Sequence, residues 1–365
     1  MRILYDHQVF SLQNAGGASR YHYELALHLS SVPGLDVCLY LGLNGSVYPF
    51  KALNSNKTRV FSIRSTARPG LVRYALNELL TQAWTMFSGR WDVYHPTLYR
   101  AIPTVRAGKM VATHHDCTHE RFPELFHDAK RIIKAKQKLF ASADSIICVS
   151  ESSRRDLLYY YGVDPQKTVV VYHGHDAVQR EPRLSHAKKD VQRPYLLYVG
   201  SRFGYKNFTG LLHAFSESGL ARDYDLLAVG GGQWSKAESD LANRLNVLGQ
   251  LKLIPHADDS VLAEAYANAT VFVYPSRYEG FGFPPLEAMS AGCPVAASRC
   301  SSIPEVCGDA AFYFDPDDSG AIAKTIETAV GSPQRLTKIQ AGYETARRFS
   351  WPVCAEKTLR VYRSN

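Results

Sequence analysis

Short apolar runs alternate with longer segments of helical periodicity through the first half of the chain. The runs that predict β-strands are Arg2–Tyr5, Asp36–Leu41, Val60–Ile63, Val93–His95, Met110–Thr113, Ser145–Val149 and Thr168–Val171. The segments that predict helices between them are Ser19–Ser30, Leu71–Phe87, Asp128–Ala141 and Ser152–Tyr160. Alternation of this kind favours a parallel sheet with helices on both faces.

The same alternation resumes after a break. The residues from Asp176 to Arg193 are polar and charged and include Pro182, a composition typical of a linker. The strands predicted beyond it are Tyr195–Val199, Asp225–Val229, Gln250–Ile254, Thr270–Tyr274, Val295–Ala297 and Ala311–Phe314. The helices predicted among them are Phe208–Glu217, Ser235–Asn246, Ser260–Ala267, Pro285–Ala291 and Ala321–Ala329, and a short amphipathic pattern follows over 350–362.

These patterns predict an α/β fold of two doubly wound parallel-sheet domains. The first domain covers residues 1–178, a linker follows over 179–193, and the second covers 194–350. A chain of 365 residues is too long for one core of usual size, which also favours two domains. We expect the carboxyl ends of the two sheets to border a cleft, where ligands of doubly wound proteins bind.

Composition narrows the class of protein. Apolar residues make up 45% of the chain and charged residues 21%, which is typical of soluble globular proteins. No run of roughly 18 apolar residues occurs, and no signal-peptide pattern follows Met1, so we expect a cytoplasmic protein. The seven cysteines form no C-x-x-C, so neither a zinc site nor a redox motif is indicated.

The net charge of +8 favours anionic partners. The densest basic segment is Lys130–Lys138, in which Ile132, Ile133 and Leu139 are expected to face inward on a helix. A solvated helix face is the first interpretation, and peripheral contact with membrane headgroups is the second. Nucleic acid is not an expected partner, because no basic patch with interleaved aromatic residues occurs.

The segment Tyr274–Glu287 is the first candidate site. It predicts a strand, a glycine loop and a helix start, the arrangement that presents backbone N–H groups to a ligand. Glu279 and Glu287 add carboxylates, which accept hydrogen bonds from hydroxyl groups. A structural alternative for Glu279 is an ion pair with Arg277. For Glu287, a position in the first helical turn, where the dipole favours a carboxylate, is the alternative.

A second candidate follows the strand that ends at Gly200. Arg202 and Lys206 lie four residues apart, and Asn207 can cap the next helix. Two cations beside a helix N-terminus suit a diphosphate, although two ordinary surface cations are the alternative. The spacing is not that of a Walker loop.

Two further loops follow predicted strands in the first domain. The paired Gly16 and Gly17 let backbone approach a ligand closely, or form a plain loop before a helix. The run Thr113–His119 contains three histidines, and on a continuing strand His114 and His115 would point to opposite faces. One histidine that binds a substrate hydroxyl or phosphate is the favoured interpretation. A structural histidine and, least favoured, a zinc site are the alternatives.

Taken as an ordered set, these motifs resemble the retaining glycosyltransferases of family 4, the group 1 glycosyltransferases. The segments that carry the resemblance are Glu279-x7-Glu287, Tyr198–Asn207, Val149–Leu157, Thr113–Asp116 with Arg121–Glu124, and Ile303–Val306 with Gly308–Ala311. The resemblance implies the GT-B fold, with two facing Rossmann-like domains. It also implies that the terminal helix, residues 351–365, crosses back onto the first domain.

The same resemblance implies roles for the candidate residues. Arg202 and Lys206 would bind the donor diphosphate, and Glu287 would bind the ribose. Glu279 would contact the sugar hydroxyls. The residues that would offer it backbone N–H groups are Gly280, Phe281, Gly282 and Phe283. The Gly16–Gly17 loop would close near the phosphates, with His115 beside the transferred sugar.

The implied reaction is transfer of a hexose with retention of configuration, without cofactor or metal. The opening segment Asp6–Gln13 looks most like that of polysaccharide or O-antigen mannosyltransferases, so GDP-mannose is the expected donor and a UDP-sugar is second. The expected acceptor is a glycan or lipid-linked glycan. A sugar-nucleotide 2-epimerase and a non-catalytic nucleotide-sugar-binding protein are the competing interpretations.

Overall fold

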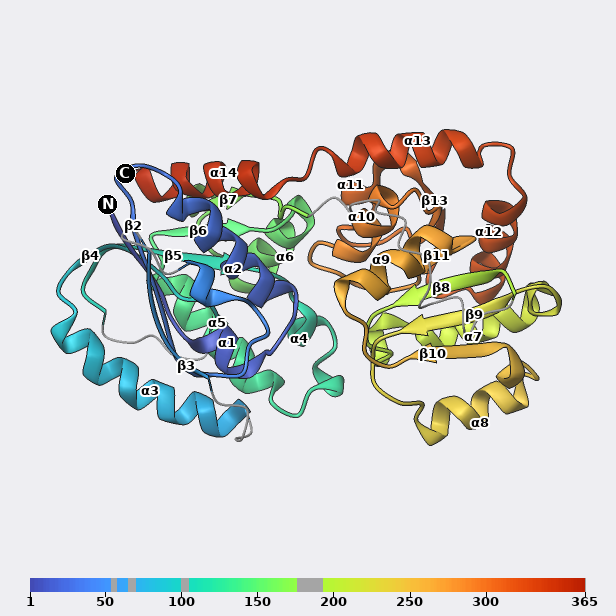
Figure 1. Ribbon diagram of the computed structural model, residues 1–365, viewed down its shortest axis with the longest axis horizontal. Helices are drawn as coiled ribbons and strands as arrows, with labels where there is room; N and C mark the ends of the chain where they lie inside the picture. The colour runs from blue at the N-terminus through green and yellow to red at the C-terminus, as the bar shows by residue number, and fades with distance from the viewer. Residues whose placement is uncertain (54–57, 65–69, 100–104, 176–192, 365) are drawn as a thin grey trace. The chain divides into compact units, whose positions relative to one another are not determined.

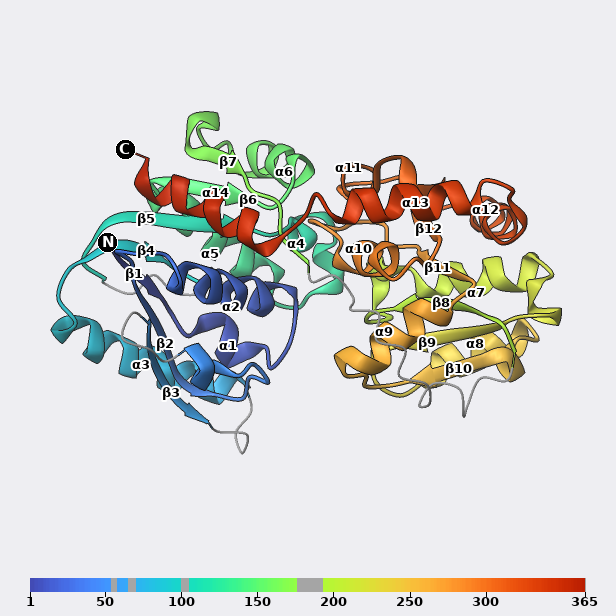
Figure 2. The same ribbon diagram turned by 45° about the horizontal axis from the view of Figure 1, so that its top comes forward.

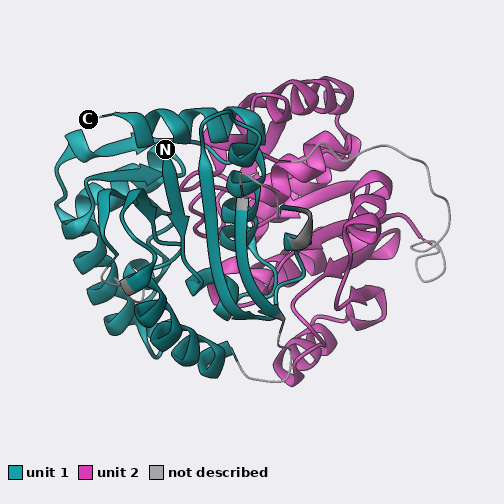
Figure 3. Cartoon of the chain, turned by 60° about the vertical axis from the view of Figure 1, so that its left-hand side comes forward, with its two compact units in different colours: residues 1–174, 350–365 teal, residues 175–349 magenta. Residues whose placement is uncertain are grey.

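The computed structural model describes residues 1–53, 58–64, 70–99, 105–175 and 193–364. It divides into two compact units (Figure 3), residues 1–174 with 350–365 and residues 175–349. The predicted linker over 179–193 lies, apart from Arg193, outside the described residues.

Unit 1 is built on a seven-stranded sheet in the order β3-β2-β1-β4-β5-β6-β7, with every pair parallel (Figure 1). Its strands are β1 Arg2–Tyr5, β2 Asp36–Asn44, β3 Thr58–Arg64, β4 Trp91–His95, β5 Ala107–His114, β6 Ser145–Cys148 and β7 Thr168–Val170. Its helices are α1 Gln8–Leu12, α2 Gly17–Ser30, α3 Gly70–Phe87, α4 Thr118–Arg121, α5 Ala129–Ser142, α6 Glu151–Tyr161 and α14 Trp351–Arg363.

Unit 2 repeats this plan with a six-stranded parallel sheet in the order β10-β9-β8-β11-β12-β13. Its strands are β8 Tyr195–Val199, β9 Asp225–Val229, β10 Leu251–Ile254, β11 Val271–Tyr274, β12 Val295–Ser298 and β13 Ala311–Phe314. Its helices are α7 Phe208–Glu217, α8 Lys236–Arg244, α9 Asp259–Asn268, α10 Phe283–Ser290, α11 Ile303–Cys307, α12 Ser319–Gly331 and α13 Arg335–Ala346.

Both faces of the unit 2 sheet are covered, as a parallel sheet requires. Neighbouring residues of β8 enter different hydrophobic clusters: Leu196 packs in one with Phe215 of α7, and Leu197 packs in the other with Tyr266 of α9. This follows from the alternation of side chains along a strand. It also explains why the strands appear in the sequence as continuous apolar runs.

The predicted two-domain α/β fold is confirmed, and each predicted strand is present with bounds shifted by a few residues at most. Four helices had no prediction: α1, α4, α11 and α13. The first three span only four or five residues, too few to show a period. Helix α13 buries only Gly342, Thr345 and Ala346, which is too little apolar surface for a visible stripe.

The terminal helix α14 belongs to unit 1 and runs alongside α2 (Figure 2). It buries Trp351, Leu359 and Tyr362. Its entry requires Gly174, because a Cβ there would lie 2.1 Å from the Trp351 backbone nitrogen. The return of this helix to the first unit was predicted and is confirmed.

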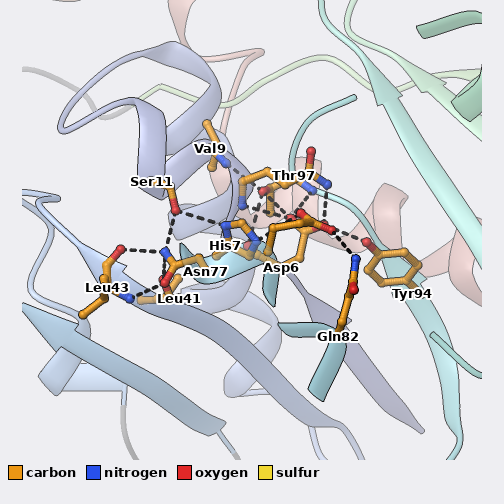
Figure 4. Close-up of polar contacts among 12 residues, drawn as sticks. Asp6, His7, Val9, Ser11, Leu41, Leu43, Asn77, Gln82, Tyr94 and Thr97 are labelled. Carbon is orange, nitrogen blue, oxygen red and sulfur yellow. Dashed lines mark hydrogen bonds and ion pairs between the residues drawn. The ribbon is translucent and has the colours of Figure 1, made fainter. Parts of the chain in front are cut away.

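A buried carboxylate fixes the loop after β1 (Figure 4). The Asp6 carboxylate accepts hydrogen bonds from the Gln8 side chain at 2.7 Å, the Tyr94 hydroxyl at 2.7 Å, and the Thr97 amide and hydroxyl at 3.0 and 2.7 Å. These partners come from α1, from β4 and from the loop after β4. Asp6 thus joins the ends of two neighbouring strands and sets the start of α1.

Asn77 of α3 holds the same region from the other side (Figure 4). Its side chain donates to the Ser11 hydroxyl and the Leu43 carbonyl at 2.7 Å each, and accepts from the Leu43 amide at 2.7 Å. The Leu43 amide and carbonyl thereby have hydrogen-bond partners, as backbone groups that are shielded from water require. The consequence is that α3 turns a polar side toward the unit interior.

We expect Asp6→Ala to destabilise unit 1 by about 3 kcal/mol, because it leaves several buried donors without an acceptor. For a unit of this size, that loss corresponds to a melting temperature lower by about 6–12 °C. Thermal unfolding followed by tryptophan fluorescence measures the shift. The exposed Asp240→Ala is the control, and equal melting temperatures for the two variants would contradict the role given to Asp6.

Candidate active site

In unit 2 the strand order reverses between the paired strands β8 and β11. At such a switch point the loops after the two strands lie side by side, and no crossover connection covers them. The loop after β8 carries Arg202 and Lys206, and the loop after β11 carries Glu279. Two candidate segments that are far apart in sequence therefore meet at one place in the fold.

Lys206 and Glu279 form an ion pair at this point. The Lys206 ammonium lies 2.7 Å from Oε1 and 2.9 Å from Oε2 of the carboxylate. The side chains are 20% and 11% exposed, so the pair stands at the border between protein interior and solvent. The proposed alternative partner of Glu279, Arg277, instead pairs with Asp317 at 2.7 Å.

The loop that bears Glu279 is held by two serines. Ser301 Oγ accepts from the Glu279 amide at 2.9 Å, and Ser302 Oγ lies 2.9 Å and 2.8 Å from the carbonyls of Glu279 and Phe281. Ser301 adopts a left-handed conformation with φ of 49°, which costs free energy in a non-glycine residue. Gly282, the residue immediately before α10, has a φ of 112°. No sequence pattern predicts the contact of these serines with the loop, because they are more than 20 residues from it along the chain.

Glu279 also has a tyrosine neighbour. The hydroxyl of Tyr274, at the end of β11, forms a hydrogen bond with the carboxylate. Burial, together with the Glu279 charge and this bond, raises the pKa of Tyr274 well above its usual value. Tyr274 therefore remains a hydrogen-bond donor and fixes one side of the carboxylate.

The guanidinium of Arg202 is engaged by protein groups. Its Nε donates to Glu238 at 2.6 Å, and its Nη atoms donate to the carbonyls of Gly230 at 2.6 Å, Gly232 at 3.2 Å and Gln233 at 2.7 Å. Its side chain is only 4% exposed. A donor contact was predicted for Arg202, yet four of its five N–H groups are used within the unit.

Arg202 holds the triple-glycine loop that follows β9. Gly230, Gly231 and Gly232 all have positive φ, and a Cβ on Gly231 would lie 2.7 Å from Arg202 Nη1. Trp234 packs on the guanidinium at 4.6 Å. The conformation of this loop depends on glycine and on this arginine.

Two local predictions about the helix starts were wrong. Helix α10 begins at Phe283 instead of Pro285, so Glu287 lies beyond the first turn, and the dipole does not account for it. Its carboxylate accepts from the Tyr266 hydroxyl at 3.0 Å. Asn207 stands at the start of α7, but its side chain donates to the Pro316 carbonyl at 2.7 Å and caps nothing.

In unit 1 the predicted glycines lie at the start of α2. Gly16 precedes the helix and Gly17 is its first residue. A Cβ on Gly16 would lie 2.7 Å from the Gln13 side-chain oxygen, so the loop is tightly folded.

His114 and His115 point to opposite sides of the sheet, as predicted. The ring of His114 packs on Phe140 of α5, and the ring of His115 packs on Tyr21 of α2. His115 Nε2 is buried and, among the described residues, has no hydrogen-bond partner. That nitrogen is the polar group through which His115 can act on a ligand.

His115 is partly exposed and belongs to a cluster with three buried histidines. His22, His95 and His173 lie within about 6 Å of one another or of His115, around Tyr21. His95 donates or accepts at both ring nitrogens, with Tyr362 of α14 at 2.6 Å and Thr113 at 2.8 Å. Burial lowers the pKa of His95 to about 3 and that of His115 to about 4. These rings are therefore neutral at pH 7.

The basic segment on α5 is less basic at its surface than predicted. Lys136 is buried and pairs with Glu120 at 3.1 Å, while it also donates to the Asp116 carbonyl at 2.8 Å. Burial would raise the pKa of Asp116, but the Lys136 charge and the bond from Thr118 outweigh it and leave that pKa lowered. Lys136 thus stabilises the turn after His115.

The described part of the chain contains neither a group of side chains suited to a metal ion nor a membrane-spanning helix. Within 1–53, 58–64, 70–99, 105–175 and 193–364, no three histidine, cysteine or acidic side chains are arranged to hold a metal ion. Over the same ranges, no helix has both the length and the apolarity needed to cross a bilayer.

Two models of known protein families together match nearly the whole chain. The model of the family described as Glycosyltransferase Family 4 matches residues 15–179, and that of Glycosyl transferases group 1 matches residues 180–345. The O-antigen chain mannosyltransferase B of Escherichia coli is 33% identical over 331 residues, which are 86% of this chain and 84% of that protein. The chain belongs to the group 1, family 4 glycosyltransferases.

Two further proteins are similar to this chain, one in sequence and one in fold. An MMP alpha-(1->4)-mannosyltransferase of Mycolicibacterium hassiacum is 27% identical over 296 residues, 75% of this chain and 71% of that protein. The structure of Anabaena Alr3699/HepE in complex with UDP-glucose superposes with a TM-score of 0.71 at 20% identity, covering 99% of this chain and 98% of that one. The fold is therefore GT-B, and the protein is a glycosyltransferase.

We expect Arg202→Lys to loosen residues 229–235, because an ammonium cannot reproduce the forked donation of a guanidinium. Hydrogen–deuterium exchange in this segment should accelerate about tenfold, and Glu238→Gln should produce a smaller change in the same direction. Arg277→Lys, at the exposed pair with Asp317, is the matched control. Unchanged exchange in Arg202→Lys would show that the loop does not depend on this residue.

The buried histidines predict that unit 1 loses stability in acid. They accept protons at lower pH in the folded unit than in the unfolded chain, where the pKa is about 6.5. The unfolded state therefore binds more protons between about pH 6.5 and 4, and the free energy of unfolding falls as the pH decreases, by about 1.4 kcal/mol per pH unit for each histidine.

His95→Gln, which can keep both hydrogen bonds, should make this pH dependence shallower. Urea unfolding of unit 1 at several pH values between 4 and 7 measures the slope. The exposed His256→Gln should leave it unchanged. A slope equal to that of the original protein in His95→Gln would exclude His95 as a contributor.

Proposed function

We propose that the protein is a retaining mannosyltransferase that uses GDP-mannose and elongates a glycan or lipid-linked glycan of a cell-surface polysaccharide in the cytoplasm. The observation that carries the proposal is the Lys206–Glu279 pair at the switch point of unit 2, in a family member whose relatives include mannosyltransferases. A UDP-sugar is the second candidate donor, favoured by the UDP-glucose complex of the structural neighbour.

Lys206 would bind the donor diphosphate. An ammonium has three N–H groups, and two of these are directed to Glu279 in the unliganded unit. A phosphate oxygen can take the third or compete for the others. Each shift toward phosphate frees carboxylate lone pairs of Glu279 for the hydroxyls of the sugar, so the pair changes partners when the donor binds.

The rest of the donor site is assigned on position. Backbone groups at the α10 N-terminus, from Gly280 to Phe283, would face the sugar end of the donor. Glu287 would accept from the ribose hydroxyls, with Tyr266 fixing its second side. Gly16 and Gly17 at the α2 N-terminus would approach the phosphates, and His115 would donate or accept through Nε2 at the transferred sugar.

The proposed reaction occurs on one face of the sugar. The bond from the anomeric carbon to the diphosphate oxygen breaks, the acceptor oxygen bonds to that carbon, and the acceptor proton passes to the departing phosphate. Lys206 and the α10 N-terminus stabilise the charge that builds on the leaving group. No carboxylate is assigned as a nucleophile, and no divalent cation is required; undiminished transfer in EDTA tests the second point.

We expect Glu279→Ala to lower transfer at least 100-fold while the melting temperature changes little, because a partly exposed pair contributes only about 1 kcal/mol. Activity is measured with GDP- and UDP-sugars, and the same panel is screened for thermal stabilisation of the protein. Asp317→Ala, which breaks the neighbouring exposed pair, is the control. Normal transfer by Glu279→Ala would contradict the assigned site. Thermal stabilisation by UDP-sugars alone would identify a UDP-sugar, instead of GDP-mannose, as the donor.

Release of free epimerised sugar nucleotide in the absence of an acceptor would instead identify an epimerase. A trapped covalent glycosyl adduct would contradict the one-face reaction.

A further inference from the structure

Helix α3 in unit 1 exposes its apolar side. Leu71, Val72, Leu79, Leu80 and Phe87 are between 44% and 88% exposed. Ala75 and Ala83 are exposed as well, so that residues 71, 75, 79, 83 and 87 form a stripe with a spacing of four. Each step of four residues turns by about 40° on an α-helix, so this row winds along α3 and stays within the exposed half of the helix.

The opposite side of α3 is polar and buried. Arg73, Asn77, Thr81 and Thr85 repeat with the same spacing, and each is at most 5% exposed. Arg73 donates to the Ser11 carbonyl and the Asn14 side chain, beside the contacts of Asn77. A helix that needs its polar side inside must leave its apolar side outside, so the exposed stripe is a consequence of how the β1 and β2 loops are held.

The apolar surface continues onto the edge strand β3. Phe61 and Ile63 are 42% and 63% exposed, and Phe61 packs against Trp84 of α3 at 5.3 Å. An uncovered apolar edge of this kind is unusual in a protein that works alone in water. We define the α3–β3 surface as the exposed apolar residues of Gly70–Phe87 together with Phe61 and Ile63.

The charges around this surface suit an anionic sheet of headgroups. Within α3 the ionisable side chains are Arg73, which is buried, and Glu78, which lies 3.7 Å from buried His7. The exposed stripe therefore carries no charge. Arg90 is exposed three residues beyond the helix, and the whole chain carries a net charge of +8.

The dimensions argue against a second copy as the occupant. An 18-residue helix is about 27 Å long and about 10 Å wide, so its face covers roughly 270 Å². A stable protein interface needs about 800 Å² on each partner. A bilayer surface has no such threshold, because affinity grows with the apolar area that lies among the acyl chains.

We propose that the α3–β3 surface is a membrane-binding surface, on which α3 lies parallel to the bilayer plane with its apolar stripe at the boundary between headgroups and acyl chains. It lies on different elements from Lys130–Lys138, the segment for which membrane contact was the second interpretation of the sequence. The inference is independent of the proposed donor, since vesicle binding requires neither donor nor acceptor.

Flotation with vesicles of phosphatidylcholine containing 30% phosphatidylglycerol tests the proposal with the full chain. Leu79→Glu combined with Phe87→Glu should weaken binding at least tenfold. Leu336→Glu, which places the same charge at a 78% exposed leucine of unit 2, should leave binding unchanged. Ala83→Leu extends the stripe and should tighten binding about fivefold. An unchanged melting temperature of Ala83→Leu separates this gain from vesicle binding by misfolded chains.

The outcomes separate the occupants. Weaker binding in the double variant with tighter binding in Ala83→Leu supports the proposal. Equal binding by the original protein and both α3 variants would overturn it, as would a dimer in solution that the double variant converts to a monomer. Loss of vesicle binding only in variants of the exposed lysines of α5 would show that α5, and not the α3–β3 surface, contacts the membrane.

Discussion

Loops that follow parallel strands end the regular backbone pairing, and their polar groups must find other partners. In this protein, side chains from distant parts of the chain supply those partners. Arg202 binds three carbonyls of residues 230–233, and Ser302 binds the carbonyls of Glu279 and Phe281. In unit 1, Asp6 accepts from the Thr97 amide in the loop after β4, and Asn77 donates to the Leu43 carbonyl near the end of β2. The strand ends of both units are shaped by this constraint.

The consequences differ between the units. In unit 2 the constraint fixes the glycine loop and the turn after β11, so that Lys206 and Glu279 meet at a rim where a ligand can replace either partner. In unit 1 it draws the polar side of α3 inward and leaves an apolar stripe outside. The proposed donor site and the proposed membrane-binding surface thus arise from the same physical need.

The sequence predicted the strands well, because buried parallel strands appear as apolar runs whatever their partners are. It also located Glu279 and Lys206, since both follow such runs. It failed where partners are distant. Arg277, which is two residues from Glu279 in sequence and was an alternative partner for it, pairs with Asp317, and Arg202 resembles a free cation although Glu238, 36 residues away, pairs with it. Short helices such as α1 contain too few residues to show a period.

The sequence by itself determined the α/β class, the two-domain plan and the positions of the candidate acidic and basic residues at strand ends. These follow from local periodicity, which is read along the chain, whereas the return of the last helix was implied only by the family resemblance. Only the tertiary structure decided which charges are paired, that Glu287 lies beyond the first turn of α10, and which side of α3 faces water. Each of these depends on groups brought together by the fold, and a one-dimensional pattern does not contain their distances.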